Sequence, residues 1–291
     1  MRKIYIPALL VLLITLFTYS VHAESKSLPN PYVKNYPFKS AIIHYKNTIT
    51  HAHGKTVEGT TVAYIKGDKT AMVTKMPVPN GSGKPQEVET MQIIDPQYIY
   101  LINMNTDVGT KLDNPIKFTK AAYEALSASE KKTFHERLAK SGIASMDLPF
   151  LGVKEKSEEV IGRKCDLYHL SSGFTEGTVD SEYWDEQTCV WGNTGIVLKN
   201  IQERQGGLIT QTATKIEENV PIPDSKFVAP KGAKITYDEA TSEYRKDGAL
   251  AAFNSLKTGE PMLFKIKLKG ASIKAKKATS KEKQEKESQT K

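Results

Sequence analysis

Hydrophobic and polar residues alternate in short runs along most of this chain. From Phe38 to about Gln205 these runs are separated by residues that favour turns, a pattern typical of β-strands. Tyr64–Lys66 and Lys69–Met76 flank the dipeptide Gly67-Asp68, which predicts a hairpin with a two-residue loop. The pattern therefore indicates a protein built mainly from β-strands.

The next strands are separated by a loop rich in proline and glycine. Met76–Pro85 contains two early prolines and the sequence Asn-Gly-Ser-Gly, so we expect an exposed loop that ends the strand. Met91–Ile94 and Tyr98–Met104 follow as strands, joined by a turn at Asp95-Pro96. The second of these strands is apolar on both faces. Such a strand is covered on both sides, by helices, a second sheet layer or a ligand.

A helical interval, Thr119–Ser141, interrupts the series of strands. Ser127 and Glu130 have the spacing of a capping box, so we expect one helix to end there and a second to begin directly afterwards. Phe134 and Leu138 lie four residues apart on one face of the second helix. We expect that face to pack on the sheet.

Strands resume after Pro149. Because parallel strands need crossover helices, and only one helical interval lies within the series, we expect an antiparallel sheet. A further amphipathic helix is predicted at Gly248–Lys257, followed by Gly259, and Phe227–Val228 is predicted to be a short extended arm. The strand-like segments of this region are Arg163–Leu170, Thr178–Asp185, Cys189–Trp191, Gly195–Ile201 and Leu208–Ile216.

The amino terminus has the pattern of a secretory signal peptide. Met1-Arg2-Lys3 precedes a hydrophobic run, and Val21 and Ala23 suit the small-residue positions of a cleavage site. We expect cleavage after Ala23, with a linker at 24–37 and the folded domain at 38–264. An uncleaved signal anchor is the alternative, because the run approaches the length that spans a bilayer. No cysteine stands near the cleavage point, so the protein is predicted to be periplasmic or secreted, without a lipid anchor there.

The chain contains two cysteines, Cys165 and Cys189. In an exported protein we expect them to form a disulfide, because the compartments outside the cytoplasm are oxidising. Their spacing is not that of a Cys-x-x-Cys redox motif, so the expected role of the bond is structural. A pair of buried thiols is the alternative.

Positive charge is concentrated at the two ends of the chain. The formal net charge is +8, yet Lys265–Lys291 alone holds ten lysines and three glutamates, and Arg2 and Lys3 add two positive charges. The rest of the chain is therefore nearly neutral. The tail, 265–291, is basic and poor in hydrophobic residues, which predicts disorder. It lacks aromatic residues for base stacking, which argues against nucleic acid as a partner, but it is suited to an anionic membrane surface.

No motif in the chain indicates catalysis. Gly81–Lys84 resembles part of a phosphate-binding loop, but Pro85 follows directly and the motif is incomplete. His51 and His53 share one face of a predicted strand and are candidates for a metal pair, although zinc sites need three or four ligands. We expect no metal, no cofactor and no catalytic residues, and a secreted hydrolase is kept as a third interpretation.

Residues Ile161–Thr236 contain the most distinctive pattern of the chain. Together with the earlier hairpin Gly59–Lys69 and the strand Asp95–Met104, this region resembles exported bacterial proteins with the LolA/LolB-like fold of outer-membrane lipoprotein-sorting proteins, including their uncharacterised relatives. The resemblance extends over about Phe38–Ile235. The segments that carry it are Gly162–Tyr168, Cys189–Trp191, Gly195–Lys199, Ala213–Ile216 and Phe227–Ile235.

The resemblance implies an α+β fold that is mainly antiparallel β. Its sheet is an open, strongly curved half-barrel, with helices on the concave side and an apolar cavity between them. Relatives of this kind carry acyl chains or other apolar ligands across an aqueous compartment. Lipoprotein carriers of the family commonly place an arginine just after the early hairpin turn, and Lys69–Met72 contains none. The resemblance therefore favours apolar-ligand binding in general over lipoprotein shuttling.

In a half-barrel some aromatic and methionine side chains must line the concave face, where they suit a variable apolar ligand. We predict a non-catalytic carrier or chaperone that holds a lipid, an acyl chain or a lipidated partner. The alternative is an envelope-associated interaction protein whose cavity its own side chains fill. A cavity on the order of several hundred Å³ would favour the carrier. The candidate cavity residues are Tyr45, Tyr64, Met72, Met91, Ile93, Tyr98, Tyr100, Ile102, Met104, Trp184 and Leu198.

Overall fold

The computed structural model describes residues 30–51, 54–79, 85–141, 153–172, 184–192, 194–204 and 207–260. The predicted signal peptide and the predicted disordered tail lie outside these ranges, as do His53 and Gly81–Lys84. Within them, no helix is long and apolar enough to cross a membrane.

The described residues form twelve strands and four helical segments. The helical segments are α2 (Ile116–Glu124), α3 (Ala128–Lys140), α4 (Glu239–Thr258) and the short 3-10 helix η1 (Asp224–Phe227). The strands are β1 (Ser40–His51), β2 (Thr56–Lys66), β3 (Lys69–Pro79), β4 (Pro85–Ile94), β5 (Tyr98–Asn103), β6 (Val108–Asp113), β7 (Val153–Val160), β8 (Arg163–Ser172), β9 (Trp184–Trp191), β10 (Ile196–Arg204), β11 (Gly207–Glu218) and β12 (Lys234–Tyr237).

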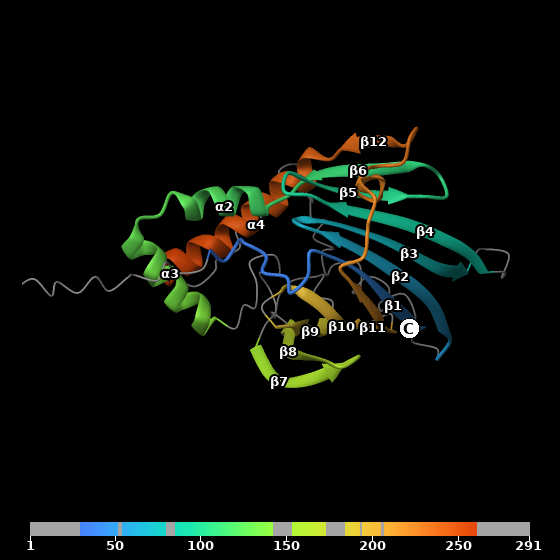
Figure 1. The fold of residues 1–291 in the computed structure, drawn as a ribbon, viewed down its shortest axis with the longest axis horizontal. Helices are drawn as coiled ribbons and strands as arrows, with labels where there is room; N and C mark the ends of the chain where they lie inside the picture. The colour runs from blue at the N-terminus through green and yellow to red at the C-terminus, as the bar shows by residue number, and fades with distance from the viewer. Residues whose placement is uncertain are drawn as a thin grey trace, which may run out of the picture.

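All of these strands belong to one open sheet, in the order β12-β6-β5-β4-β3-β2-β1-β11-β10-β9-β8-β7. Neighbouring strands are antiparallel, apart from the parallel pair of β12 and β6. The sheet curves until β4–β6 and β8–β10 lie on opposite sides of a hollow (Figure 1). The predicted fold class, a curved and mainly antiparallel half-barrel, is therefore confirmed.

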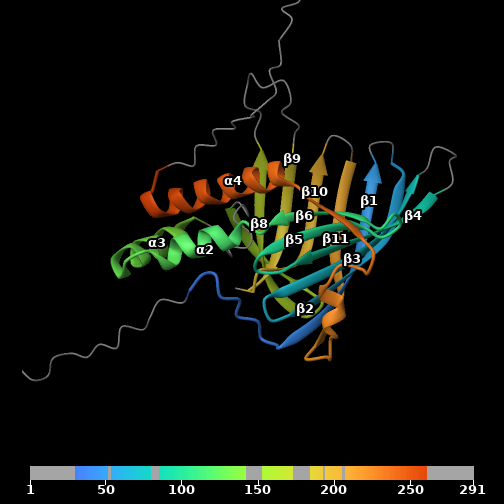
Figure 2. The same cartoon turned by 90° about the horizontal axis from the view of Figure 1, so that it is seen from above.

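The first strand joins the two halves of the sheet. β1 pairs with β2 along one edge and with β11 along the other, where the register runs from Ala41 opposite Glu218 to His51 opposite Gly207. Figure 2 shows β1 between these neighbours, seen from above. The strand at the free edge of the second half, β7, carries five charged residues in eight, which discourages pairing with other chains.

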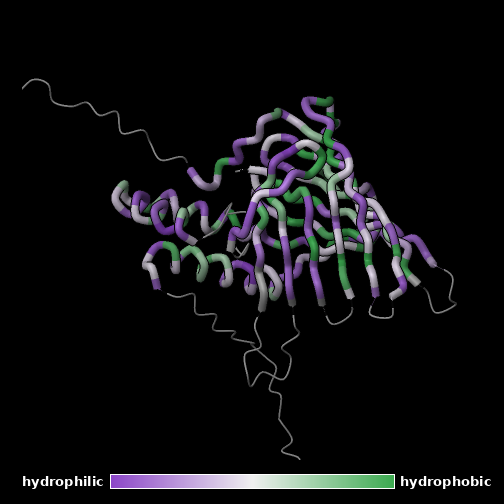
Figure 3. Tube along the Cα trace, turned by 90° about the horizontal axis from the view of Figure 1, so that it is seen from below, coloured by the Kyte–Doolittle hydropathy of each residue, from purple (hydrophilic) through white to green (hydrophobic). Residues whose placement is uncertain are grey.

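Hydrophobic residues cover both faces of the sheet, and they alternate along the strands with polar ones (Figure 3). On the concave face, Ile43, Ile65 and Leu198 belong to a buried cluster. On the opposite face, an outer cluster lies under the segment that follows β11. This outer cluster consists of Ala71, Met91, Ile93, Ile102, Ile222 and Phe227. The expectation that β5 is covered on both sides is confirmed at Ile99 and Ile102, whereas Leu101 between them is exposed.

The helices pack mainly against one another, at one end of the sheet. The predicted capping box is present: Ser127 Oγ accepts from the Glu130 amide, and the Glu130 carboxylate accepts from the Ser127 amide. The expected contact of Phe134 with the sheet is wrong, because this side chain is fully buried against Tyr123 of α2 and Phe253 of α4.

The C-terminal helix is longer than predicted. It begins at Glu239 rather than Gly248, because Asp238 caps it by accepting from the Thr241 amide. Its first half carries few hydrophobic residues, so the helical period is not visible there. It ends as expected at Gly259, whose φ of 80° is the left-handed conformation that glycine adopts freely.

Several predicted strand boundaries are wrong. β3 continues through Pro77 to Pro79, where a loop was predicted. The pairing of β3 with β2 ends at Lys75, so the prolines lie where one side of the strand is an edge. The predicted arm at Phe227–Val228 instead includes the end of η1.

Other strands were missed or divided. β6 and β7 were not predicted, because Val108–Asp113 is weakly hydrophobic and most residues of β7 are charged. The segments predicted at Thr178–Asp185 and Cys189–Trp191 are parts of one strand, β9, as far as the structure describes them.

Cys165 in β8 and Cys189 in β9 form a disulfide, as predicted, with their Cα atoms 5.4 Å apart. Both residues are buried in the concave cluster. The bond joins neighbouring strands on either side of the 173–183 connection, and its presence agrees with an oxidising compartment.

Candidate functional site

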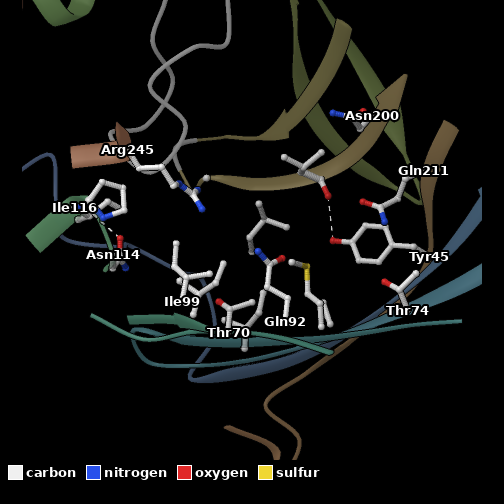
Figure 4. A pocket seen from close by; sticks show the side chains of 18 of the residues that line it. Tyr45, Thr70, Thr74, Gln92, Ile99, Asn114, Ile116, Asn200, Gln211 and Arg245 are labelled. Atoms are coloured by element: carbon white, nitrogen blue, oxygen red, sulfur yellow. Dashed lines mark hydrogen bonds between the residues drawn. The ribbon is translucent and has the colours of Figure 1, made fainter. Parts of the chain in front are cut away.

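The curvature of the sheet creates a cavity of about 840 Å³ on its concave side. Strands β1–β5 form one wall, β10 and β11 form the opposite wall, and α2 and α4 close one end. Figure 4 shows side chains from these elements pointing into the same space. The cavity has the size of pockets that enclose small organic ligands.

Hydrophobic side chains make up most of the cavity wall near the helices. Two of these residues lie on α2 and α4, and the four on strands alternate with the outer cluster, so that Ile94 lies in the cavity and its neighbour Ile93 lies on the other face. Their arrangement follows from the two-residue period of a strand. They are Ile65, Met72, Ile94, Ile99, Ile116 and Ala249.

A polar row crosses the concave face farther along the strands. It consists of uncharged side chains on six consecutive strands of the sheet, namely Thr188, Asn200, Gln211, Asn47, Thr61 and Thr74. On β3 the polar row is represented by Thr74. This residue lies four positions beyond Thr70, which corresponds to about 13 Å along a strand. The cavity therefore combines an apolar part near the helices with a polar part across the middle of the sheet.

The central members of the polar row bind one another. Asn47 Nδ2 donates to Thr61 Oγ1 at 2.7 Å, and Gln211 Nε2 donates to Asn47 Oδ1 at 3.0 Å. The hydroxyl oxygens of Thr61 and Thr74 lie 2.8 Å apart. Asn47 and Thr61 are buried, so these bonds satisfy groups that would otherwise be costly to bury.

At its β9 end the polar row is bonded to a carboxylate that lies beside it on the same face of the sheet. Asn200 and Gln202 both donate their amide hydrogens to Glu186 Oε1, and Asn200 also donates to Thr188 Oγ1 at 3.1 Å. Asn200 and Gln202 line the cavity, whereas Glu186 does not. The carboxylate therefore orients the amides without exposing its charge to the cavity.

Tyr45 provides a polar atom on the opposite wall. Its hydroxyl donates to the Val197 carbonyl at 3.0 Å, across the concave face (Figure 4). Burial raises the pKa of this hydroxyl well above its usual value, because the charged phenolate would be poorly solvated. Tyr45 therefore stays neutral and acts as a hydrogen-bond donor.

The cavity walls carry two charged side chains among the described residues, and both are cationic: Lys34, which precedes β1, and Arg245 of α4. No carboxylate lines the cavity within the described ranges. In Figure 4 the Arg245 guanidinium points into the cavity from its helical end. The charged side chains that line this end of the cavity are therefore positive.

The predicted cavity residues are distributed over both faces of the sheet. Tyr45 and Met72 line the concave cavity. Tyr64, Met91 and Met104 line a second cavity of about 560 Å³ on the opposite face. Ile93, Tyr100 and Ile102 lie in or against the outer cluster.

Of the remaining candidates, Tyr98 and Leu198 line neither of these cavities. The ring of Tyr98 lies under Lys111, whose Nζ is 3.5 Å from its centroid. Leu198 is fully buried beside the disulfide. Trp184 begins β9, and its side chain is outside what the structure describes.

Sequence reasoning did not find the polar row or the contribution of α4. The signal for the row was present as Thr, Asn and Gln at alternate positions, such as Asn47 two residues after Tyr45. Polar residues in strands ordinarily indicate a solvent-facing side, so this pattern does not point to a cavity.

Three histidines make side-chain contacts in separate places. His44 Nε2 lies 2.9 Å from Glu217, and His135 Nε2 lies 2.8 Å from the Tyr123 hydroxyl. His169 lies between Glu155 and Asp185. None of these four contacts is with a serine, as a hydrolase triad would require. Over the described ranges, no group of three or more His, Cys, Asp or Glu side chains is arranged to hold a metal ion.

Comparison with known proteins gives matches in structure alone. No family model matches the chain, and no curated protein matches its sequence. A LolA superfamily protein from Nitrosomonas europaea matches at 9% identity and a TM-score of 0.29, over 68% of this chain and 94% of that one. A DUF1329 family protein from Desulfovibrio piger matches at 11% identity and a TM-score of 0.31, over 66% of this chain and 90% of that one.

PNGF-II matches at 16% identity and a TM-score of 0.36, over 72% of this chain. The match covers 33% of PNGF-II, so this chain corresponds to about a third of that protein. A LolA superfamily protein is thus among the matching structures. At these identities and scores the matches carry no information about a ligand, and the function is argued from the cavity.

Proposed function

We propose that this protein is an exported, non-catalytic carrier that holds the apolar chain of a lipid, an acylated molecule or a lipidated partner on the concave side of its sheet. The observation that carries the proposal is the cavity of about 840 Å³ with its apolar walls. Removing apolar surface from water stabilises a bound chain by roughly 25 cal/mol per Å².

The size of the cavity supports ligand binding over the alternative of an interaction protein with a self-filled core. A gap of this size would leave the surrounding side chains without packing partners, which is costly unless water or a ligand enters. The apolar part of the wall offers few partners to water. An apolar ligand is therefore the better occupant for that part.

The first experiment is native mass spectrometry of the protein purified from its own source, followed by extraction and lipid analysis. We expect a stoichiometric adduct that leaves on denaturation and is recovered in the organic phase. A clean mass of the protein alone in repeated preparations, together with no uptake of fluorescent fatty-acid probes, would contradict the proposal and favour the interaction-protein alternative.

A substitution that fills the cavity tests its location. Ala249 lines the cavity on α4, so the indole of Ala249→Trp would occupy volume that a ligand needs. We expect binding of a fluorescent fatty-acid probe to weaken by about tenfold or more, equivalent to about 1.4 kcal/mol. The matched control is Asn254→Trp, an exposed position on the same helix, which should bind the probe as the unmodified protein does. Equal loss in both variants would place the binding elsewhere.

A further inference from the structure

The side chain of Arg245 brings a positive charge to the helical end of the cavity. Lys34 and Arg245 line the cavity, and no carboxylate within the described ranges does so. Among these residues Arg245 makes no ion pair or hydrogen bond, whereas its neighbour on the helix, Lys246, pairs with Glu243 at 3.3 Å. Glu186, the carboxylate that accepts from Asn200 and Gln202, lies beside them on β9 and does not line the cavity.

The position of Arg245 directs its charge inward. The residue is partly buried, and its guanidinium points between α4 and the strands that carry Thr70, Gln92 and Ile99 (Figure 4). Next to it, Asn114 is already engaged, since its side chain donates to the Asp95 carbonyl and accepts from the Ile116 amide. The neighbouring protein groups therefore leave the guanidinium donors available to a ligand.

A positive charge beside apolar walls is poorly solvated, which costs free energy unless an anion is bound next to it. Arginine presents a planar set of donors that matches the two oxygens of a carboxylate or a phosphate. Ile65, Ile94 and Ile99 form the adjoining apolar wall, which suits a hydrocarbon chain and not a second charge.

We propose that the ligand of the cavity is an anionic amphiphile whose carboxylate or phosphate is bound by Arg245, with its hydrocarbon chain along the apolar wall towards the polar row. This inference rests on the proposed function and adds to it the charge of the ligand and the direction in which it lies. Lys34 contributes a second positive charge at the same cavity.

The test compares three ligands with the same twelve-carbon chain and different heads: dodecanoate, dodecyl phosphate and dodecan-1-ol. Binding to the full chain is measured by displacement of an uncharged fluorescent alkyl probe, below the aggregation concentration of each ligand. We expect at least one anion to bind about ten- to a hundredfold more tightly than the alcohol, as a hydrogen-bonded ion pair does over a neutral contact. The anion with the larger preference identifies the head group.

Variants then assign the preference to a residue. In Arg245→Gln, we expect the affinity for the anion to fall to that for the alcohol. Retained binding of the alcohol by this variant would show that its cavity is intact. Arg245→Lys should retain part of the preference. The control, Lys246→Gln, removes the same charge from the same helix at a residue that does not line the cavity, and should retain all of it.

The possible failures are distinguishable. If the unmodified protein binds the alcohol and both anions equally, the inference is overturned and the proposed function stands. If Arg245→Gln keeps the full preference for the anion, the assignment to Arg245 is overturned. If none of the three ligands binds, the proposed function itself fails.

Discussion

At the scale of single residues, the polar row shows how a cavity wall can be polar and still well ordered. Asn47 is 5% exposed and bridges β1 to its neighbours through Thr61 and Gln211. In Asn47→Leu both partners would lose a hydrogen bond in a buried place. We expect a loss of about 1–3 kcal/mol in the free energy of unfolding, measured by urea denaturation. Thr48→Val, the next position on the opposite face, is the control and should change stability by less than about 0.5 kcal/mol.

His169 provides a pH-dependent contact among the last strands of the sheet. Its Nδ1 lies 2.9 Å from Glu155 of β7, and its Nε2 lies 2.8 Å from Asp185 of β9. The hydrogen bond to Asp185, followed by the charges of both carboxylates, raises the pKa of His169 above its usual value of 6.5. Folding therefore favours the protonated ring.

The sign of the pH effect follows from this raised pKa. The stabilisation from His169 is complete below pH 6.5 and is lost as the pH rises through the pKa of the folded protein. We expect the free energy of unfolding to fall between pH 6 and pH 8.5, and the fall to be smaller in His169→Gln. Denaturant titrations at the two pH values measure it. An identical fall in both proteins would show that other groups cause it.

The sequence could identify residues that belong to the sheet, but not the face on which each one lies. Ile93 and Ile94 are the same amino acid at adjacent positions, and one lies in the outer cluster while the other lines the cavity. The difference depends on which face is concave and on the segment after β11 that covers the other one. Both are properties of the assembled chain, so candidates such as Tyr64 and Met91 could not be assigned to a face.

At the scale of elements, local signals were the ones that predicted structure well. The capping box at Ser127 and the terminal Gly259 act within one helical turn, and both were found. β6 was missed because its sequence, VGTKLD, is weakly hydrophobic. Its Gly109 is needed for close packing, since a Cβ there would lie 2.8 Å from the Leu101 carbonyl oxygen and from Ile235. The atoms that impose this requirement belong to β5 and β12, so the sequence of β6 alone does not reveal it.

The disulfide should stabilise the sheet where β8 and β9 are joined. It links positions 24 residues apart and therefore restricts the unfolded chain. We expect the double variant Cys165→Ala/Cys189→Ala to lose about 2–4 kcal/mol in the free energy of unfolding. Adding a reductant should destabilise the unmodified protein by a similar amount and leave the double variant unchanged. A reductant effect on the double variant would show that the change does not come from this bond.

At the scale of the whole molecule, a ligand in the cavity would contact both halves of the sheet. Because β1–β5 and β10–β11 line the same space, bound ligand should oppose the separation of these halves. At a free concentration of about 100 times its dissociation constant, a ligand stabilises the folded state by about 2.7 kcal/mol. For a domain of this size we expect a rise in Tm of about 5–10 °C.

This rise is measured by thermal unfolding with and without the tightest of the twelve-carbon ligands. Ala249→Trp, whose cavity is partly filled, should show a much smaller rise at the same ligand concentration. A rise of equal size in both proteins would indicate that the ligand binds outside the cavity.

The pairing of β1 with β11 has a consequence for biosynthesis. Asn47 and Gln211 are neighbours in the folded sheet but are separated by 164 residues in the chain. At a synthesis rate of about 5–20 residues per second, the ribosome needs roughly 8–30 s to make that interval. Throughout this time the outer edge of β1 has no partner strand and can pair with other nascent chains. The edge of β1 is therefore covered only when Gly207–Glu218 joins the sheet, late in the sequence.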